Sequence, residues 1–86
     1  MPSYLLEVYV SKVDSVPRAS EDARRVADAA VPDAGELRYV RTLFLTEDET
    51  CFHVFEASSR EVLVEAALRA GLSDARVTEA IEREGR

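Results

Sequence analysis

The sequence predicts one α+β domain whose elements follow the order strand, helix, strand, strand, helix, strand. Its 86 residues are fewer than the roughly 150 of an average domain, so we expect a single unit over residues 1–86. Residues 4–10 and 36–45 have strand-like patterns, and two other segments have the apolar spacing of helices. The hydrophobic content of 47% is sufficient for a small core.

The first predicted strand and the first predicted helix lie in the N-terminal half. Residues 4–10 alternate between two faces, which is the period-two pattern of a strand. Residues 11–18 are rich in loop-forming residues and are expected to connect the two elements. Ser20 is expected to cap a helix that carries a narrow apolar stripe. Pro32 ends this helix, because the residue before a proline is disfavoured in the α region.

A hairpin and a final strand supply the rest of the predicted sheet. Residues 36–45 are rich in Leu, Tyr, Val, Thr and Phe, and residues 51–56 form the returning strand. The acidic segment 47–49 between them is short enough for a hairpin turn. Residues 76–81 form the last, short strand.

The second predicted helix has the clearest local signal in the chain. Ser58 is followed three residues later by Glu61, which is the spacing of a capping box. The helix is expected to end near Ala70, because Gly71 can adopt the left-handed conformation that terminates helices.

Charge and cysteine content exclude several functional classes. Seventeen acidic residues against eleven basic ones give a net charge of −6, so attraction to a phosphate backbone is missing and nucleic acids are not expected partners. No apolar run approaches the roughly 18 residues that cross a bilayer, and no secretory signal precedes the first strand. The single cysteine, Cys51, forms no intrachain disulfide, and this fits a reducing, cytoplasmic location.

The element order matches a ferredoxin-like βαββαβ domain with a four-stranded antiparallel sheet. Right-handed crossovers then give the strand order 4-1-3-2 and place both helices on one face. We expect the helix-covered side to hold Leu6, Val8, Phe52 and Val54, and the open side to hold Leu5, Tyr9, Leu43, Leu45 and Phe55. An apolar open face normally marks an interface, so we predict a homodimer whose sheets pack face to face, as in dimeric α+β barrels.

Three polar residues are predicted to gather on this open face. If the first and third strands pair near their centres, Glu7 lies opposite His53. A hairpin loop of three residues adds Arg41 to the same face, whereas a loop of two residues brings a different pair. That pair is Arg38 and Thr42. Charged groups in an apolar environment are retained only when they are paired, so this cluster is the candidate site.

The cluster has three interpretations. Glu7 and Arg41 can form an interface salt bridge with His53 as a satisfied partner. A second possibility is a small-ligand pocket between the sheets, lined by these three residues and Tyr9. The third is a site for nickel, zinc or copper with His53, Glu7 and Cys51 as ligands, completed by water or a second subunit. No catalytic residue is assigned, because Cys51 and His53 lack a third orienting group.

Four stretches of the sequence carry a resemblance. They are YLLE at Tyr4–Glu7, YVRTLFLTED at Tyr39–Asp48, CFHVFEA at Cys51–Ala57 and RAGLSDARVTEA at Arg69–Ala80. Together they cover most of the chain, and they resemble a family of small bacterial proteins of unknown function that includes a nickel-responsive, nickel-binding actinobacterial member. The resemblance implies a ferredoxin-like fold, dimerisation and, more loosely, metal binding.

The sequence therefore predicts a cytoplasmic homodimer that binds a small ligand or a transition metal, nickel first, at the face between the sheets. His53 is expected to coordinate or hydrogen-bond the guest, Glu7 to orient the imidazole, and Arg41 to neutralise the carboxylate. The alternative is a cofactor-free monooxygenase or isomerase, with His53 as general base and Arg41 stabilising an oxyanion. A third interpretation is that the protein is a structural or regulatory partner of another molecule and binds no ligand.

Overall fold

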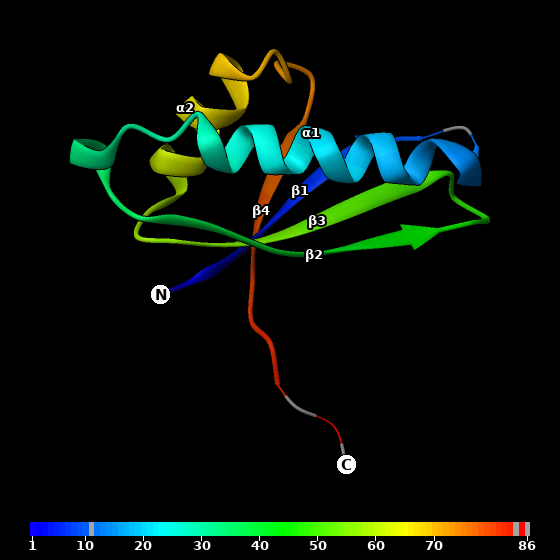
Figure 1. Cartoon of the computed structure of the whole chain (residues 1–86). Helices are drawn as coiled ribbons and strands as arrows, with labels where there is room; N and C mark the ends of the chain where they lie inside the picture. Colours follow the sequence, from blue (N-terminus) through cyan, green and yellow to red (C-terminus); the bar gives the residue numbers. More distant parts are fainter. Residues whose placement is uncertain (11, 84, 86) are drawn as a thin grey trace.

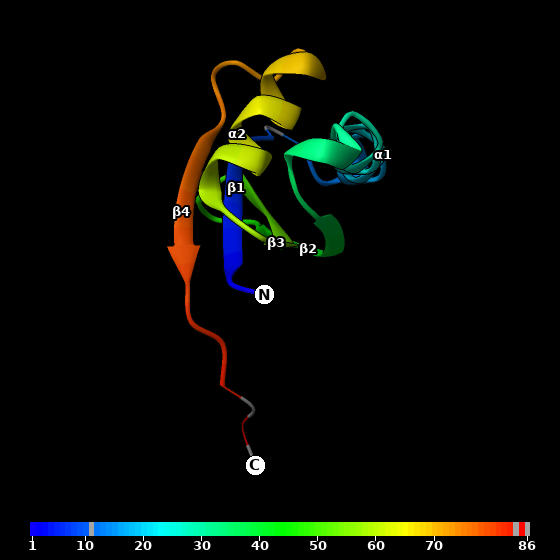
Figure 2. The same ribbon diagram turned by 90° about the vertical axis from the view of Figure 1, so that its left-hand side faces the viewer.

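The computed structural model, which describes residues 1–10, 12–83 and 85, has two layers. One is a four-stranded sheet and the other contains two helices that lie on the same side of it (Figures 1 and 2). The elements are β1 (Ser3–Tyr9), α1 (Val16–Asp28), β2 (Leu37–Leu45), β3 (Thr50–Ala57), α2 (Arg60–Arg69) and β4 (Arg76–Ala80), with short 3-10 turns at Val13–Ser15 and Pro32–Ala34.

The strand order confirms the predicted ferredoxin-like α+β fold. The strands lie in the order β2-β3-β1-β4, which is the predicted 4-1-3-2 order counted from the opposite edge. All three neighbouring pairs are antiparallel. The sheet therefore has β1 and β3 at its centre and leaves one face without helices.

The register of the central pair differs from the prediction by one residue. Leu6 lies opposite His53, and Glu7 lies opposite Phe52. The predicted pairing of Glu7 with His53 is therefore wrong. Because side chains alternate along a strand, this shift moves His53 to the helix-covered side and Phe52 to the open side. The residues of β3 that face the helices are Cys51, His53, Phe55 and Ala57, all buried.

Helix α1 begins earlier than predicted. It starts at Val16 with Pro17 in its first turn, where proline costs no backbone hydrogen bond, and the 3-10 turn at Val13–Ser15 leads into it. The predicted loop over 11–18 is therefore wrong from residue 13 onward, while Ser11 lies outside the described residues. Ser20 is consequently inside the helix, where its hydroxyl is available for contacts with the sheet.

Helix α2 is capped one residue later than predicted. The hydroxyl of Ser59 accepts a hydrogen bond from the amide of Val62, whereas Ser58 accepts one from the amide of Glu36. The predicted end is confirmed: Gly71 has φ 86°, and the amide of Leu72 donates to the carbonyl of Ala67. This C-terminal turn fixes the position of Leu72 beside the sheet.

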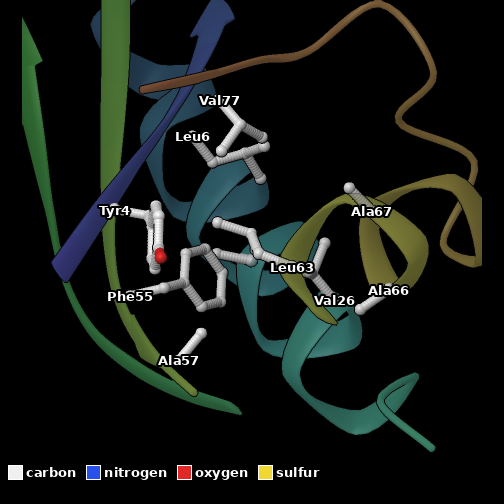
Figure 3. Close-up of a cluster of buried hydrophobic side chains, with 10 residues drawn as sticks. Tyr4, Leu6, Val26, Phe55, Ala57, Leu63, Ala66, Ala67 and Val77 are labelled. Atoms are coloured by element: carbon white, nitrogen blue, oxygen red, sulfur yellow. The ribbon is translucent and has the colours of Figure 1, made fainter. Parts of the chain in front are cut away.

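The main core lies between the sheet and the two helices (Figure 3). Leu6 and Phe55 from the central strands have no exposed surface, and neither has Leu63 of α2. Val26 contributes from α1. A fully buried side chain of this size stabilises the fold by about 1.5–3 kcal/mol relative to an exposed one. A second apolar cluster, formed by Val10, Ala19 and Cys51, lies beyond this core at the C-terminal end of β1.

Candidate functional site

The open face of the sheet carries exposed apolar side chains beside charged ones. Tyr9, Leu43 and Leu45 are exposed there, and Phe52 is partly exposed. Phe55, which was expected on this face, is buried in the core on the opposite side. An exposed apolar surface of this kind is typical of an interaction site.

The structure separates the residues of the predicted polar cluster. Arg41 lies on the open face opposite Val54, and its guanidinium forms a 3.2 Å ion pair with Glu82. Glu7 lies on the same face with Arg76 of β4 as its cross-strand neighbour. Strand β3 stands between β1 and β2, and His53 faces the other way. The interpretation in which all three meet on one face is therefore not supported within a protomer.

The predicted metal donors are divided between the two faces of the sheet. Cys51 and His53 are on the helix-covered side, whereas Glu7 is on the open side. Among the described residues no group of three His, Cys, Asp or Glu side chains is placed to hold a metal ion. Burial also raises the pKa of the Cys51 thiol, which disfavours the thiolate that binds metals. The predicted metal site made of His53, Glu7 and Cys51 is therefore not assembled within one chain.

His53 is the one buried polar side chain in the described core, and it has no exposed surface. Its Nδ1 lies 2.7 Å from the hydroxyl oxygen of Thr42, its neighbour on β2. Its other ring nitrogen, Nε2, has no hydrogen-bond partner within the described part of the chain. A buried polar atom in this state costs about 1–3 kcal/mol, so its retention calls for an explanation.

Burial determines the charge of His53. Removal of the imidazole from water lowers its pKa from 6.5 to about 4, and the nearby carboxylate of Asp22 offsets only part of this effect. The ring is therefore neutral at pH 7, with one nitrogen carrying a proton and the other a lone pair.

Three hydroxyl groups form a hydrogen-bonded chain that ends at His53. The Ser20 hydroxyl lies 2.7 Å from the Tyr39 hydroxyl, Tyr39 contacts Thr42, and Thr42 contacts Nδ1 of His53. The Tyr39 ring also packs edge-on against the imidazole, with 6.2 Å between ring centroids. These contacts hold the Nδ1 edge of the ring toward β2.

A β-bulge makes this chain possible. Tyr39 and Thr42 are three residues apart, so a regular strand would place them on opposite faces. The register of β2 shifts between Tyr39 and Arg41, and both Tyr39 and Thr42 consequently face the helices. The extra residue at Val40 therefore reorients Thr42 toward His53.

A small cavity, here called the His53 chamber, lies beside the imidazole between β1, α1 and the segment after α2. Its volume is about 150 Å³. It is lined by Val8, Tyr9, Val10, Ala19, Asp22, His53 and Leu72. Thr42 holds Nδ1 of His53 toward β2, on the other side of β3 from β1, and the imidazole belongs to the lining of the chamber. The chamber therefore combines mainly apolar walls with an imidazole edge and one carboxylate.

A larger surface cleft, here called the outer cleft, adjoins the chamber. It has a volume of about 520 Å³ and shares Val8, Tyr9 and Leu72 with the chamber. Its charged lining residues are Glu7, Asp74 and Arg76. His53 itself has no exposed surface, so a molecule in the cleft reaches the imidazole only after a shared side chain such as Leu72 moves.

Sequence reasoning identified His53 but missed its partners. Ser20 was assigned to a cap, Thr42 was considered only as an open-face residue, and Tyr39 was not considered as a site residue. The helical spacing that brings Ser20 and Ala23 to the sheet-facing side was a usable signal for Ser20. The bulge that redirects Thr42 has no comparable signal in the sequence.

Comparisons with protein-family models, curated proteins and solved structures gave no match to this chain. Within the residues that the structure describes, neither α1 nor α2 has the length and hydropathy needed to cross a membrane.

Proposed function

We propose that this chain is a small, cytoplasmic, homodimeric binding protein that holds a small organic molecule in the His53 chamber. The observation that carries the proposal is that His53 lines a cavity while its buried Nε2 has no partner among the described residues. Because His53 has no exposed surface, a guest in the chamber reaches Nε2 once a lining side chain such as Leu72 moves. A guest that hydrogen-bonds to this atom recovers part of the roughly 1–3 kcal/mol lost by burying it unpaired. This places the guest between the sheet and the helices, instead of between two sheets.

The size of the chamber supports a compact guest. A cavity of about 150 Å³ is large enough for a benzene-sized molecule. Its walls include Val8, Val10 and Ala19, which provide nonspecific apolar contact, while His53 provides orientation. The only cysteine, Cys51, is buried and free, and this is compatible with a reducing compartment.

The homodimer is supported by the uncovered sheet face. Four strands spaced about 4.8 Å apart and about seven residues long cover roughly 450 Å² of plane. Packing two such faces together buries roughly 900 Å² of flat surface, and the uneven surface of the side chains adds to this area. The total is close to the ~1,000 Å² of the smallest biological interfaces. The exposed Tyr9, Leu43 and Leu45 supply the apolar contacts of such an interface.

Dimerisation can be tested with two matched substitutions. Leu43 on the open face is 49% exposed, and Leu68 on α2 is 55% exposed. Leu43→Glu is expected to convert the dimer to a monomer in sedimentation equilibrium, because the new charge loses its hydration in the interface. Leu68→Glu introduces the same charge elsewhere and should leave the mass unchanged. A native protein that sediments as a monomer at micromolar concentration contradicts this part of the proposal.

Ligand binding can be tested by filling the chamber. Phenol serves as a probe of suitable size, with binding followed by NMR and by the melting temperature. Ala19 lines the chamber, so Ala19→Leu is expected to abolish binding, whereas Arg18→Leu on the exposed side of α1 is the matched control. Equal binding by the two variants would show that the probe sits elsewhere.

Nickel is tested in the same way, because Cys51 and His53 share one face of β3. A ligand present at 100 times its dissociation constant stabilises the native state by about 2.7 kcal/mol, which raises the melting temperature of a small domain by several degrees. An unchanged melting temperature with nickel removes the metal interpretation and leaves the organic guest.

A further inference from the structure

Which hydroxyl donates to which along this chain is considered first at Ser20, the end of the chain farthest from His53. Its hydroxyl oxygen lies 2.7 Å from that of Tyr39 but 3.4 Å from that of Thr42. Hydrogen bonds between hydroxyl groups span about 2.5–3.0 Å, so Tyr39 is the only one of these two oxygens that can accept the Ser20 proton well. A chain in which Ser20 donates to Tyr39 therefore gives the Ser20 proton its best acceptor among these side chains.

The remaining protons follow from this first one. In such a chain Tyr39 donates to Thr42, and Thr42 donates to Nδ1 of His53 over 2.7 Å. In this direction every hydroxyl proton in the chain has an acceptor. In the reverse direction the proton of Ser20 has no close side-chain acceptor among the described residues.

This direction assigns the tautomer of His53. A neutral imidazole whose Nδ1 accepts a hydrogen bond carries its proton on Nε2. Nε2, the ring nitrogen that lacks a partner in the described structure, is then a hydrogen-bond donor. The site is thus suited to a guest with an oxygen acceptor.

The second residue of the lining with an ionisable side chain is Asp22, and its carboxylate is near enough to act electrostatically on His53. It accepts a hydrogen bond from Arg25 at 2.8 Å, so it remains an acceptor with capacity for a further donor. The chamber consequently offers one donor, Nε2–H of His53, and one acceptor, Asp22, with apolar side chains around them.

We infer that the His53 chamber selects compact, uncharged alcohols or phenols, whose hydroxyl oxygen accepts from Nε2–H of His53 and whose hydroxyl proton is donated to Asp22. This inference rests on the proposed function and specifies its ligand class. A hydroxyl group is the smallest group that satisfies both wall groups at once, and the apolar remainder of the molecule contacts Val8, Val10 and Leu72.

The same arrangement excludes charged guests. A carboxylate guest would face the negative charge of Asp22 without a cation inside the chamber to compensate, because His53 is neutral. An ammonium guest has only donors and would leave Nε2–H unpaired. Discrimination between neutral and charged molecules of equal size is therefore a direct consequence of the two wall groups.

The experiment compares phenol, toluene and benzoate by NMR titration of the full chain at pH 7. Phenol and toluene have nearly the same size, but only phenol carries a hydroxyl group. Phenol is expected to bind about tenfold more tightly than toluene, the equivalent of about 1.4 kcal/mol, and benzoate is expected to bind more weakly than either. In His53→Phe the preference of phenol over toluene should disappear.

The outcomes test the proposed function and the inferred ligand class separately. If neither phenol nor toluene binds, the chamber is not a ligand site and the proposed function fails. If both bind equally, the chamber is a ligand site but the inferred class is wrong. The ring-nitrogen NMR signals of His53 provide a test that needs no variant, because a proton found on Nδ1 instead of Nε2 overturns the inference.

Discussion

The buried imidazole of His53 makes the stability of this protein depend on pH in a range where few other groups titrate. His53 is the only histidine in the chain. In the native state burial lowers its pKa from 6.5 to about 4. Between these values the unfolded chain binds a proton that the native chain does not, so the free energy of unfolding falls as the pH falls.

The magnitude follows from the two pKa values. At about 1.4 kcal/mol for each pH unit of difference, the complete effect is roughly 3 kcal/mol, spread between pH 6.5 and pH 4. About 2 kcal/mol of it is expected between pH 7 and pH 5, before most carboxylates are protonated. The stabilisation is fully present above pH 6.5 and is lost progressively as the pH approaches 4.

The assay is urea unfolding at pH 7 and pH 5, at one fixed protein concentration because a dimer would make stability concentration-dependent. The control is His53→Phe, which keeps an aromatic ring at this position and removes the titrating group. Its stability should change by much less than that of the native sequence over the same range. The reasoning is refuted if the two proteins lose the same stability between the two pH values.

Three further substitutions test the packing around the site and the core. Gly35→Ala should destabilise the fold by about 1–3 kcal/mol in urea unfolding. Gly35 has φ 137°, and an added Cβ would clash with the hydroxyl oxygen of Ser58. An unchanged free energy of unfolding would contradict this prediction. Leu63→Ala, in the centre of the core, should cost about 2–5 kcal/mol by the same measurement, and a loss below this range would mean that the core closes over the cavity. Thr42→Val removes the donor to Nδ1 without a large volume change and should cost about 1 kcal/mol and alter the tautomer signals of His53; unchanged NMR signals would argue against the hydroxyl chain.

The fold was predictable because its determinants are local. Gly71 ends α2 through a left-handed conformation, and the alternation of residues 4–10 identifies β1 with its correct faces. Ser58 and Ser59 are adjacent and chemically equivalent, so sequence alone does not decide which of them caps α2. The error there is one residue and has no effect on the topology.

The site was less predictable because β3 is apolar on both faces. Phe52 and Val54 lie on one side and Phe55 and Ala57 on the other, so alternation does not show which side meets the helices. The long-range pairing with β1 decides it, and it places His53 inside. A buried histidine with an unpaired nitrogen is recognisable only once the surrounding elements have been assembled.

The extra residue at Val40 shifts the alternation of β2 side chains between the two faces of the sheet by one residue. Before it, Tyr39 faces the helices; after it, Thr42 and Phe44 do so, while Arg41 and Leu43 face outward. Deleting Val40 would leave Tyr39 and Thr42 two residues apart, and in a regular strand both would still face the helices with Arg41 between them facing outward. The insertion is thus tolerated only because the bulge absorbs it. If the same sequence formed a regular strand, either Tyr39 or Thr42 would turn to the outer surface and its hydroxyl would leave the chain to His53.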